Sequence, residues 1–250
     1  MKVMTDKVRF SVLAPIVEIL QSPLEYGMIK RAIEDDRLEV TLIPLRKFTK
    51  GVHSAIDDKP YGGGAGMVLS YDPIKEGIDY AQNKNGKFSG IYLLTPSGEL
   101  FNQKIAREML INKSNLLICG RYEGFDERVK QIIPMREISL GDYVISGGEL
   151  AAGIIIDAVS RLIPDVLGNP LSLASESFSD NLLDYPSYTR PDEVDGLAVP
   201  EVLLSGNHKL IAKWRDAMRI IATIQKRPDL KDLDSLDEKE RELVEPYLKN

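Results

Sequence analysis

Short runs of apolar residues alternate with segments of helical pattern along the first two-thirds of the chain. Four runs rich in Val, Ile and Leu predict strands, and they cover residues 8–15, 38–45, 91–95 and 115–119. Two segments with helical periodicity, 73–84 and 101–110, lie among them. Continuous apolar strands alternating with helices are typical of a mostly parallel sheet covered on both faces, so we predict an α/β fold.

A long apolar helix is predicted next, over residues 149–163. Ser146 and Glu149 have the spacing of a capping box at its start, and Pro164 marks its predicted end. A helix with so little polar surface must be buried in the protein core or in a contact between subunits.

The pattern changes after residue 168. Residues 169–192 contain many Ser, Asp and Pro without a sustained period, and connections longer than about 15 residues are commonly functional or link domains. From about residue 201 the pattern is helical, and the chain ends in an acidic segment. We therefore expect an α/β domain over 1–168, a linker over 169–192 and a small all-α domain over 193–250.

The composition is that of a folded protein with a reduced cysteine. Thirty-two basic and 38 acidic residues give a net charge of −6, which argues against a generally basic surface but allows a local basic patch. The one cysteine, Cys119, cannot form a disulfide within the chain. No apolar run reaches the roughly 20 residues of a membrane span, and we see no signal peptide. These features predict a cytoplasmic protein without a membrane partner.

Four glycine-bearing loops follow apolar runs, over residues 60–67, 95–99, 120–128 and 139–149. In parallel α/β sheets, ligands bind beyond the carboxyl ends of the strands. Glycines at such places let backbone groups approach a ligand closely. The four loops together predict a cofactor cleft.

Common motifs do not identify that cofactor. The 60–67 loop lacks the Lys-Ser/Thr of a P-loop, and its glycines do not follow G-x-G-x-x-G. His53, His208 and Cys119 have no metal-ligand spacing, so we expect no metal site. No G-x-S-x-G elbow is present. Serine hydrolases and nucleotide-dependent oxidoreductases are therefore disfavoured.

Five motifs, in order and spacing, resemble the bacterial tRNA (guanine-N1)-methyltransferases of the SPOUT class. They are PYGGGAGM (60–67), LLTPSGE (93–99), LLICGRYEGFDERV (116–129), ISLGDYVISGGELAA (138–152) and DYPSYTRP (184–191). The resemblance spans residues 8 to 227. It implies methyl transfer from S-adenosylmethionine to N1 of the guanine 3′ to the anticodon of tRNA (position 37). It also implies a deep trefoil knot at the end of the sheet domain and a homodimer with cofactor sites near the subunit interface.

The resemblance also implies which residues contact S-adenosylmethionine, many of them through the backbone. In chain order they are Leu94, Pro96, Gly120, Tyr122, Glu123, Leu140, Gly141, Tyr143, Ile145, Gly147 and Gly148. For Tyr143 and Ile145, packing in the core is the alternative role.

Methylation of guanine N1 requires a general base, because that nitrogen carries a proton. Arg161 resembles the family's arginine that polarises O6, although a helix C-terminus also favours a surface arginine. Glu176 stands where the family usually has an aspartate before Ser-Phe, and it is longer by one methylene, about 1.5 Å. Our hypothesis is that Glu176 is the base, with Asp180 as the fallback.

The tRNA would contact both the 60–67 loop and the C-terminal segment. Gly62, Gly63, Gly64 and Gly66 would leave room for the target guanine or its neighbour. Basic residues recur at i,i+4 as Lys209/Lys213 and Arg215/Arg219, and among basic residues Arg190, Lys213 and Arg215 are our candidates for phosphate contacts. Trp214 either stacks on a base or anchors the helical core.

The alternative function is a non-catalytic RNA- or nucleotide-binding module that keeps the glycine loops, with Glu176 as its first lesion. Methyl incorporation into tRNA distinguishes the two. The sequence gives no indication for or against a divalent ion.

Overall fold

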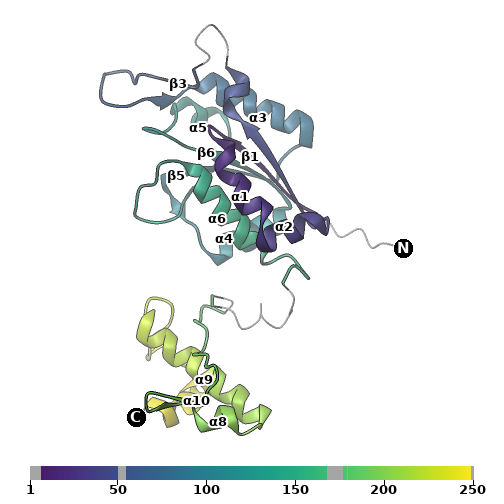
Figure 1. The fold of residues 1–250 in the computed structure, drawn as a ribbon. Helices are drawn as coiled ribbons and strands as arrows, with labels where there is room; N and C mark the ends of the chain where they lie inside the picture. The colour runs from purple at the N-terminus through teal and green to yellow at the C-terminus, as the bar shows by residue number, and fades with distance from the viewer. Residues whose placement is uncertain (1–6, 50–54, 168–176, 179, 249–250) are drawn as a thin grey trace. The chain divides into compact units, whose positions relative to one another are not determined.

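The computed structural model describes residues 7–49, 55–167, 177–178 and 180–248 (Figure 1). The chain divides into two compact units, 1–168 and 169–250. Among the described residues, no helix is both long and apolar enough to cross a membrane. Nor does this part of the chain contain a group of three or more His, Cys, Asp or Glu side chains suited to a metal ion.

A five-stranded parallel sheet forms the centre of the first unit. The strand order is β2-β1-β6-β5-β7, and each neighbouring pair is parallel. The strands are β1 (Val8–Ala14), β2 (Leu38–Pro44), β5 (Gly90–Leu100), β6 (Ser114–Cys119) and β7 (Arg136–Ser139). The predicted α/β fold with a mostly parallel sheet is therefore confirmed.

Helices cover both faces of this sheet because successive strand residues point to opposite sides. Val12, for example, belongs to one hydrophobic cluster and Leu13 to the other. Figure 1 shows the helices of the two layers. One layer holds α1 (Gln21–Glu25), α2 (Gly27–Glu34), α4 (Gln103–Asn112) and α6 (Gly148–Ser160), and the other α3 (Tyr71–Asn85) and α5 (Arg128–Ile132).

Short elements complete the first unit. They are the 3-10 helices η1 (Val17–Leu20) and η2 (Leu45–Phe48), and the antiparallel pair β3 (Asp57–Asp58) and β4 (Val68–Leu69).

The start of α6 differs from the predicted capping box. Its N-cap is Gly147, and no side chain caps it. Glu149 instead accepts a hydrogen bond from the backbone N–H of Ile16, at 3.1 Å, 133 residues away in sequence. The helix ends at Ser160, before Pro164. The capping-box prediction is wrong because a tertiary contact takes the glutamate.

Among the described residues, one apolar stripe of α6 is left exposed. Ala152, Ile155 and Val159 are buried in the core, whereas Leu150 and Ile154 are 54% and 52% exposed. These two residues are one helical turn apart, so their side chains lie on one face. The core therefore explains only part of the apolar pattern of this helix.

The second unit contains α8 (Glu201–Leu204), α9 (His208–Lys226) and α10 (Glu238–Leu248). Its core includes Ala217, Ile220 and Val244. A short antiparallel pair, β8 (Glu193–Val194) and β9 (Leu197–Ala198), accompanies the helices, so this unit is not built from helices alone. Trp214 is buried, and its ring centroid lies 6.4 Å from that of Tyr188. Trp214 therefore packs within the unit.

Candidate active site

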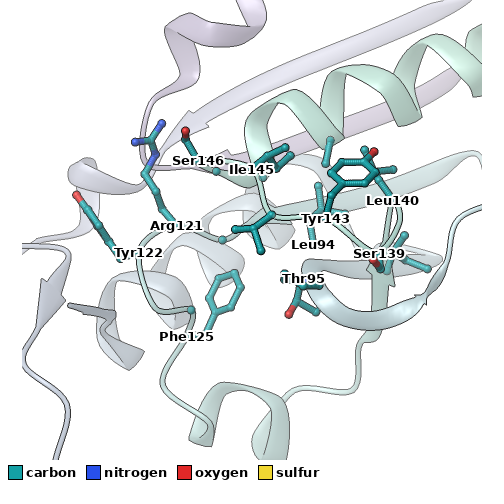
Figure 2. Close-up of a pocket in the computed structure, with 18 of the residues that line it drawn as sticks. Leu94, Thr95, Arg121, Tyr122, Phe125, Ser139, Leu140, Tyr143, Ile145 and Ser146 are labelled. Carbon is teal, nitrogen blue, oxygen red and sulfur yellow. The ribbon is translucent and has the colours of Figure 1, made fainter. Parts of the chain in front are cut away.

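Three loops meet at one edge of the central sheet. Leu94 of β5 pairs with Cys119 of β6 and with Ile138 of β7, so these parallel strands reach the same edge together. β5 leaves its pairing with β7 after Leu94 and resumes it at Glu99, so residues 95–98 form an irregular excursion. The loops that follow enclose a pocket of about 230 Å³ (Figure 2).

Every residue that the resemblance assigned to the cofactor lines this pocket. They are Leu94, Pro96, Gly120, Tyr122, Glu123, Leu140, Gly141, Tyr143, Ile145, Gly147 and Gly148. Tyr122 and Tyr143 are exposed rather than packed in the core. Residues from positions up to 54 apart in sequence thus form one concave surface.

Further lining residues were not predicted from the sequence. They are Thr95, Arg121, Gly124, Phe125, Ile138, Ser139, Val144, Ser146 and Ala151. Figure 2 shows Phe125 and Thr95 on one side of the pocket, and Arg121 beside Ser146 at one end. All nine lie within the motifs that carry the resemblance, so those motifs were the sequence signal that could have indicated them.

Gly148 lies where a side chain would collide with the backbone of the second loop. A Cβ on Gly148 would lie 2.8 Å from Cys119 Cα and 2.9 Å from Gly120 N. The N–H of Gly148 donates to the carbonyl of Gly120 at 2.7 Å, which fixes this close approach. Gly141 has a φ of +153°, a conformation that L side chains rarely adopt. Part of the pocket wall is therefore backbone, as the glycine pattern predicts.

A buried carboxylate lies behind this wall. Glu149 is 1% exposed, and its Oε1 is 3.6 Å from Nε of Arg121. Glu149 is in the first turn of α6, where the helix dipole favours a negative charge. Burial, together with the charge of Glu149, raises the pKa of the Cys119 thiol well above its usual range. The thiol therefore stays protonated.

The 60–67 loop is joined to the second pocket loop. Glu123 N–H donates to the Met67 carbonyl at 3.0 Å, and Leu69 N–H donates to the Gly124 carbonyl at 2.9 Å. The four glycines of this loop, Gly62, Gly63, Gly64 and Gly66, all have positive φ. A Cβ would meet open space at the first three, whereas at Gly66 it would lie 2.5 Å from the Glu123 carboxylate. A second cavity, lined by Tyr61 and Arg128 among others, shares Phe125 with the pocket.

Arg161 lies at the other end of α6 from the pocket. The 13 residues of this helix place it about 20 Å from Gly148. Within one chain, Arg161 therefore does not line the pocket. Glu176 lies outside the described residues. Asp180 is exposed in the second unit, with Oδ2 at 3.9 Å from Nη2 of Arg219.

The basic candidates of the second unit are exposed, with one exception. Arg190 and Arg215 line one cavity, where the guanidinium of Arg215 lies over the Tyr185 ring at 4.8 Å. Lys213 lines a different one. Arg219 is buried and faces Asp180, so the expected Arg215/Arg219 pair presents only Arg215 to solvent.

Known proteins resemble this chain over most of its length. The profile of the family described as tRNA (Guanine-1)-methyltransferase TrmD matches residues 8–232. The tRNA (guanine-N(1)-)-methyltransferase of Dictyoglomus turgidum is 46% identical over 241 residues, covering 96% of this chain and 97% of that protein. The one from Carboxydothermus hydrogenoformans is 47% identical over 236 residues, covering 94% and 92%.

A solved structure is similar as well. The crystal structure of tRNA (m1G37) methyltransferase from Aquifex aeolicus has a TM-score of 0.72 and 46% identity, and the match covers 93% of this chain and 99% of that one. The profile, the relatives and the fold agree with the motifs gathered around the pocket. This chain belongs to the tRNA (guanine-N1)-methyltransferase family.

Proposed function

We propose that this protein transfers the methyl group of S-adenosylmethionine to N1 of the guanine 3′ to the anticodon of tRNA. The observation that carries the proposal is the gathering of the family's cofactor motifs around one pocket, at the carboxyl ends of β5, β6 and β7. If these motifs were scattered over the molecule, they would form no binding site for the methyl donor.

The pocket suits a ligand with a flat nucleobase and a short polar chain. Its walls combine apolar side chains such as Leu94 and Ile145 with backbone at Gly120, Gly141 and Gly147. Such a wall offers hydrogen-bonding groups to an adenine edge and apolar contact to its faces. When bound, S-adenosylmethionine supplies a methyl group that is already activated by its sulfonium, so the chain need not supply a covalent nucleophile.

The remaining chemistry belongs to the guanine. Its N1 becomes a nucleophile as its proton leaves, and negative charge then develops toward O6. We assign acceptance of the N1 proton to the Glu176 carboxylate and the stabilisation of O6 to the planar, cationic guanidinium of Arg161. The base and the positioned cation act here without forming a covalent intermediate with the guanine.

The Glu176 assignment predicts a specific loss. Glu176→Gln should lower kcat by about 10²–10⁴-fold, because the amide cannot accept the N1 proton. Glu176→Asp, which restores the family's usual side chain, should retain activity. Cofactor affinity, measured by titration calorimetry, should stay the same in both variants. Full activity of the Gln variant would remove Glu176 from the mechanism and leave Asp180 as the candidate.

We also propose a homodimer in which the partner subunit's Arg161 completes each site. Two observations support it: Arg161 lies about 20 Å along α6 from its own pocket, and Leu150 and Ile154 leave an apolar stripe on that helix. A second copy would cover the stripe. Sedimentation of the intact protein should give twice the chain mass, and Ile154→Lys should give a monomer without activity.

The trefoil knot is likewise a proposal. The chain leaves β7 at Ser139, forms the third loop and returns to pack against the second. The N–H of Gly148 bonds to Gly120, and Arg121 forms an antiparallel bridge with Gly147. These contacts support a chain that passes between the loops of β5 and β6 before α6 begins.

We assign tRNA binding to residues 193–250 and the connection to residues 169–192. The exposed side chains of Lys213 and Arg215 support the first assignment, because phosphate contacts require accessible cations. Arg190, exposed in the connection, would add a further phosphate contact. A protein that modifies tRNA acts where tRNA resides, so we place it in the cytoplasm.

Labelled methyl transfer tests the function directly. The protein is incubated with methyl-labelled S-adenosylmethionine and an unmodified tRNA transcript that has guanine at nucleotides 36 and 37. We expect label in this transcript and none in a matched transcript with adenine at nucleotide 37. Binding of both substrates without any transfer would favour the non-catalytic module instead.

A further inference from the structure

One cation lines the pocket among the described residues, and the proposed mechanism does not use it. Apart from Arg121, the side chains of the described lining are apolar, hydroxyl-bearing or absent, except for the carboxylate of Glu123. Figure 2 shows the guanidinium of Arg121 beside Ser146, at the end of the pocket away from Leu140 and Tyr143. A single cation in a partly apolar pocket is a specific charge site.

The position of Arg121 is fixed from several directions. Its backbone forms an antiparallel bridge with Gly147, and its side chain is 19% exposed. Glu149, which is buried, approaches it from the Nε side at 3.6 Å. Glu149 is itself held by the N–H of Ile16. Arg121 is therefore preorganised before any ligand arrives.

The contact with Glu149 does not form a complete ion pair. Within the described residues, neither Nε of Arg121 nor Oε2 of Glu149 has a hydrogen-bond partner. Arg128, on the same segment, shows what a complete pair looks like: its Nε bonds to Asp126 Oδ1 at 2.9 Å and its Nη2 to Oδ2 at 2.5 Å. Asp126 thus occupies the guanidinium of Arg128, whereas the pairing of Arg121 with Glu149 leaves capacity for another anion.

We propose that Arg121, positioned by Glu149, binds the carboxylate of the methionine part of the methyl donor. This inference rests on the proposed function. That carboxylate is the one anionic group of S-adenosylmethionine, and the planar guanidinium matches a carboxylate with two parallel hydrogen bonds. A cation held at one end of the pocket sets the direction in which the donor lies. Glu149 is a positioning residue, since it acts through Arg121.

Two nucleosides that differ only in the amino-acid end distinguish carboxylate binding by Arg121 from a general effect of Arg121 on the pocket. S-adenosylhomocysteine carries the carboxylate, and 5′-methylthioadenosine lacks the whole amino-acid part. Calorimetric titrations use the full-length protein and the variants Arg121→Gln, Arg121→Lys and Glu149→Gln. Arg31→Gln, which removes one exposed charge from α2, is the matched control.

We expect Arg121→Gln to raise the Kd of S-adenosylhomocysteine by about tenfold and to change that of 5′-methylthioadenosine by less than about twofold. Arg121→Lys should show a smaller loss, because the charge stays and the two-pronged geometry is lost. Glu149→Gln should show the same selectivity at reduced size, since its amide still accepts from Ile16. Arg31→Gln should leave both values unchanged.

Three results would overturn the proposal. An equal loss for both nucleosides would mean that Arg121 shapes the pocket rather than binding a carboxylate. Unchanged affinity for both would remove Arg121 from donor binding. A selective loss of tRNA affinity alone, with a lower salt dependence, would assign Arg121 to a phosphate. If the unaltered protein bound neither nucleoside, the proposed function itself would fail.

Discussion

Gly148 and Gly153 lie on the same helix in different surroundings. A Cβ on Gly148 would meet the backbone of Cys119 and Gly120, whereas a Cβ on Gly153 would make ordinary contact with Leu20 at 3.4 Å. Backbone cannot move aside as a flexible side chain can. At the scale of single residues, the pocket thus depends on the absence of a Cβ at positions such as Gly148.

We predict opposite effects of alanine at these two glycines. Gly148→Ala should lower the free energy of unfolding by about 1–3 kcal/mol through overpacking, and it should also weaken cofactor binding. Gly153→Ala should be neutral or stabilise by up to about 1 kcal/mol, because alanine favours the helix. Denaturant titrations measure both. Equal effects of the two substitutions would show that space at Gly148 is not limiting.

The buried thiol of Cys119 gives a second prediction at this scale. Because burial and the charge of Glu149 raise the pKa of Cys119, the thiolate, which is the form that attacks iodoacetamide, is scarce in the folded protein. At pH 8.5 the native protein should therefore react at least about tenfold more slowly than the protein in urea. The mass shift counts one adduct, since the chain has one cysteine.

The sign of the associated pH dependence follows from the same shift. The folded state keeps this thiol protonated above the pKa of the unfolded thiol, about 8.5, so its contribution to stability is constant below that pH and falls as pH rises further. Fast alkylation of the native protein at pH 8.5 would mean that Cys119 is accessible and contradict the burial.

At the scale of elements, one buried hydroxyl helps to attach residues 180–183 to α9. Thr223 Oγ1 accepts from the N–H of Leu183 at 2.8 Å and donates to the carbonyl of Arg219 at 2.7 Å. Leu182 packs against the core of the same unit. The segment that follows the proposed base is thereby tied to the helix that carries the basic candidates.

Thr223→Val should remove this hydrogen bond while keeping nearly the same side-chain shape at position 223. It leaves the Leu183 N–H without its partner, so we expect a loss of about 1–3 kcal/mol in the unfolding free energy of the second unit. Thr223→Ser, which keeps the hydroxyl, is the control and should lose less. Thermal unfolding of the full chain measures both, and a Val variant as stable as the parent would rule out the hydrogen bond as an anchor.

The same scale shows what the sequence could and could not predict. Strands such as Val8–Ala14 were predicted within one residue, because continuous β-branched and aliphatic runs have few alternatives. β7 was missed because its four residues, Arg136–Ser139, include two charged side chains and no apolar run. Helix α2 was missed as well, although its apolar residues follow a helical period.

The candidate site also has parts that the sequence could predict and parts that it could not. Motifs could predict the three loops that form the pocket and part of its lining, because each loop is continuous in sequence. They could not predict that Glu149 lies behind Arg121, because the position of Glu149 depends on tertiary contacts. Glu149 approaches Arg121 from another loop and accepts from Ile16, which is 133 residues away in sequence. Spacing suggested a local capping box for Glu149, and tertiary structure overrode it.

At the scale of the whole molecule, the proposed reaction needs two contributions that the first unit of one chain does not supply. The first unit contains the pocket, and the basic candidates for tRNA belong to the second. Arg161 lies too far along α6 to serve its own pocket, so the proposed dimer provides the cation for O6. Each requirement concerns assembly rather than the chemistry of one loop.

Nucleoside analysis of the product tests the central claim most directly. An unmodified transcript with guanine at nucleotides 36 and 37 is incubated to completion with the protein and S-adenosylmethionine. One portion is then digested to nucleosides, which identifies the methylated atom, and another to oligonucleotides, which locates it, and both are analysed by mass spectrometry. Our account predicts 1-methylguanosine, one per tRNA, mapped to nucleotide 37. A transcript without added methyl groups, or with the methyl on another atom or nucleotide, would contradict it.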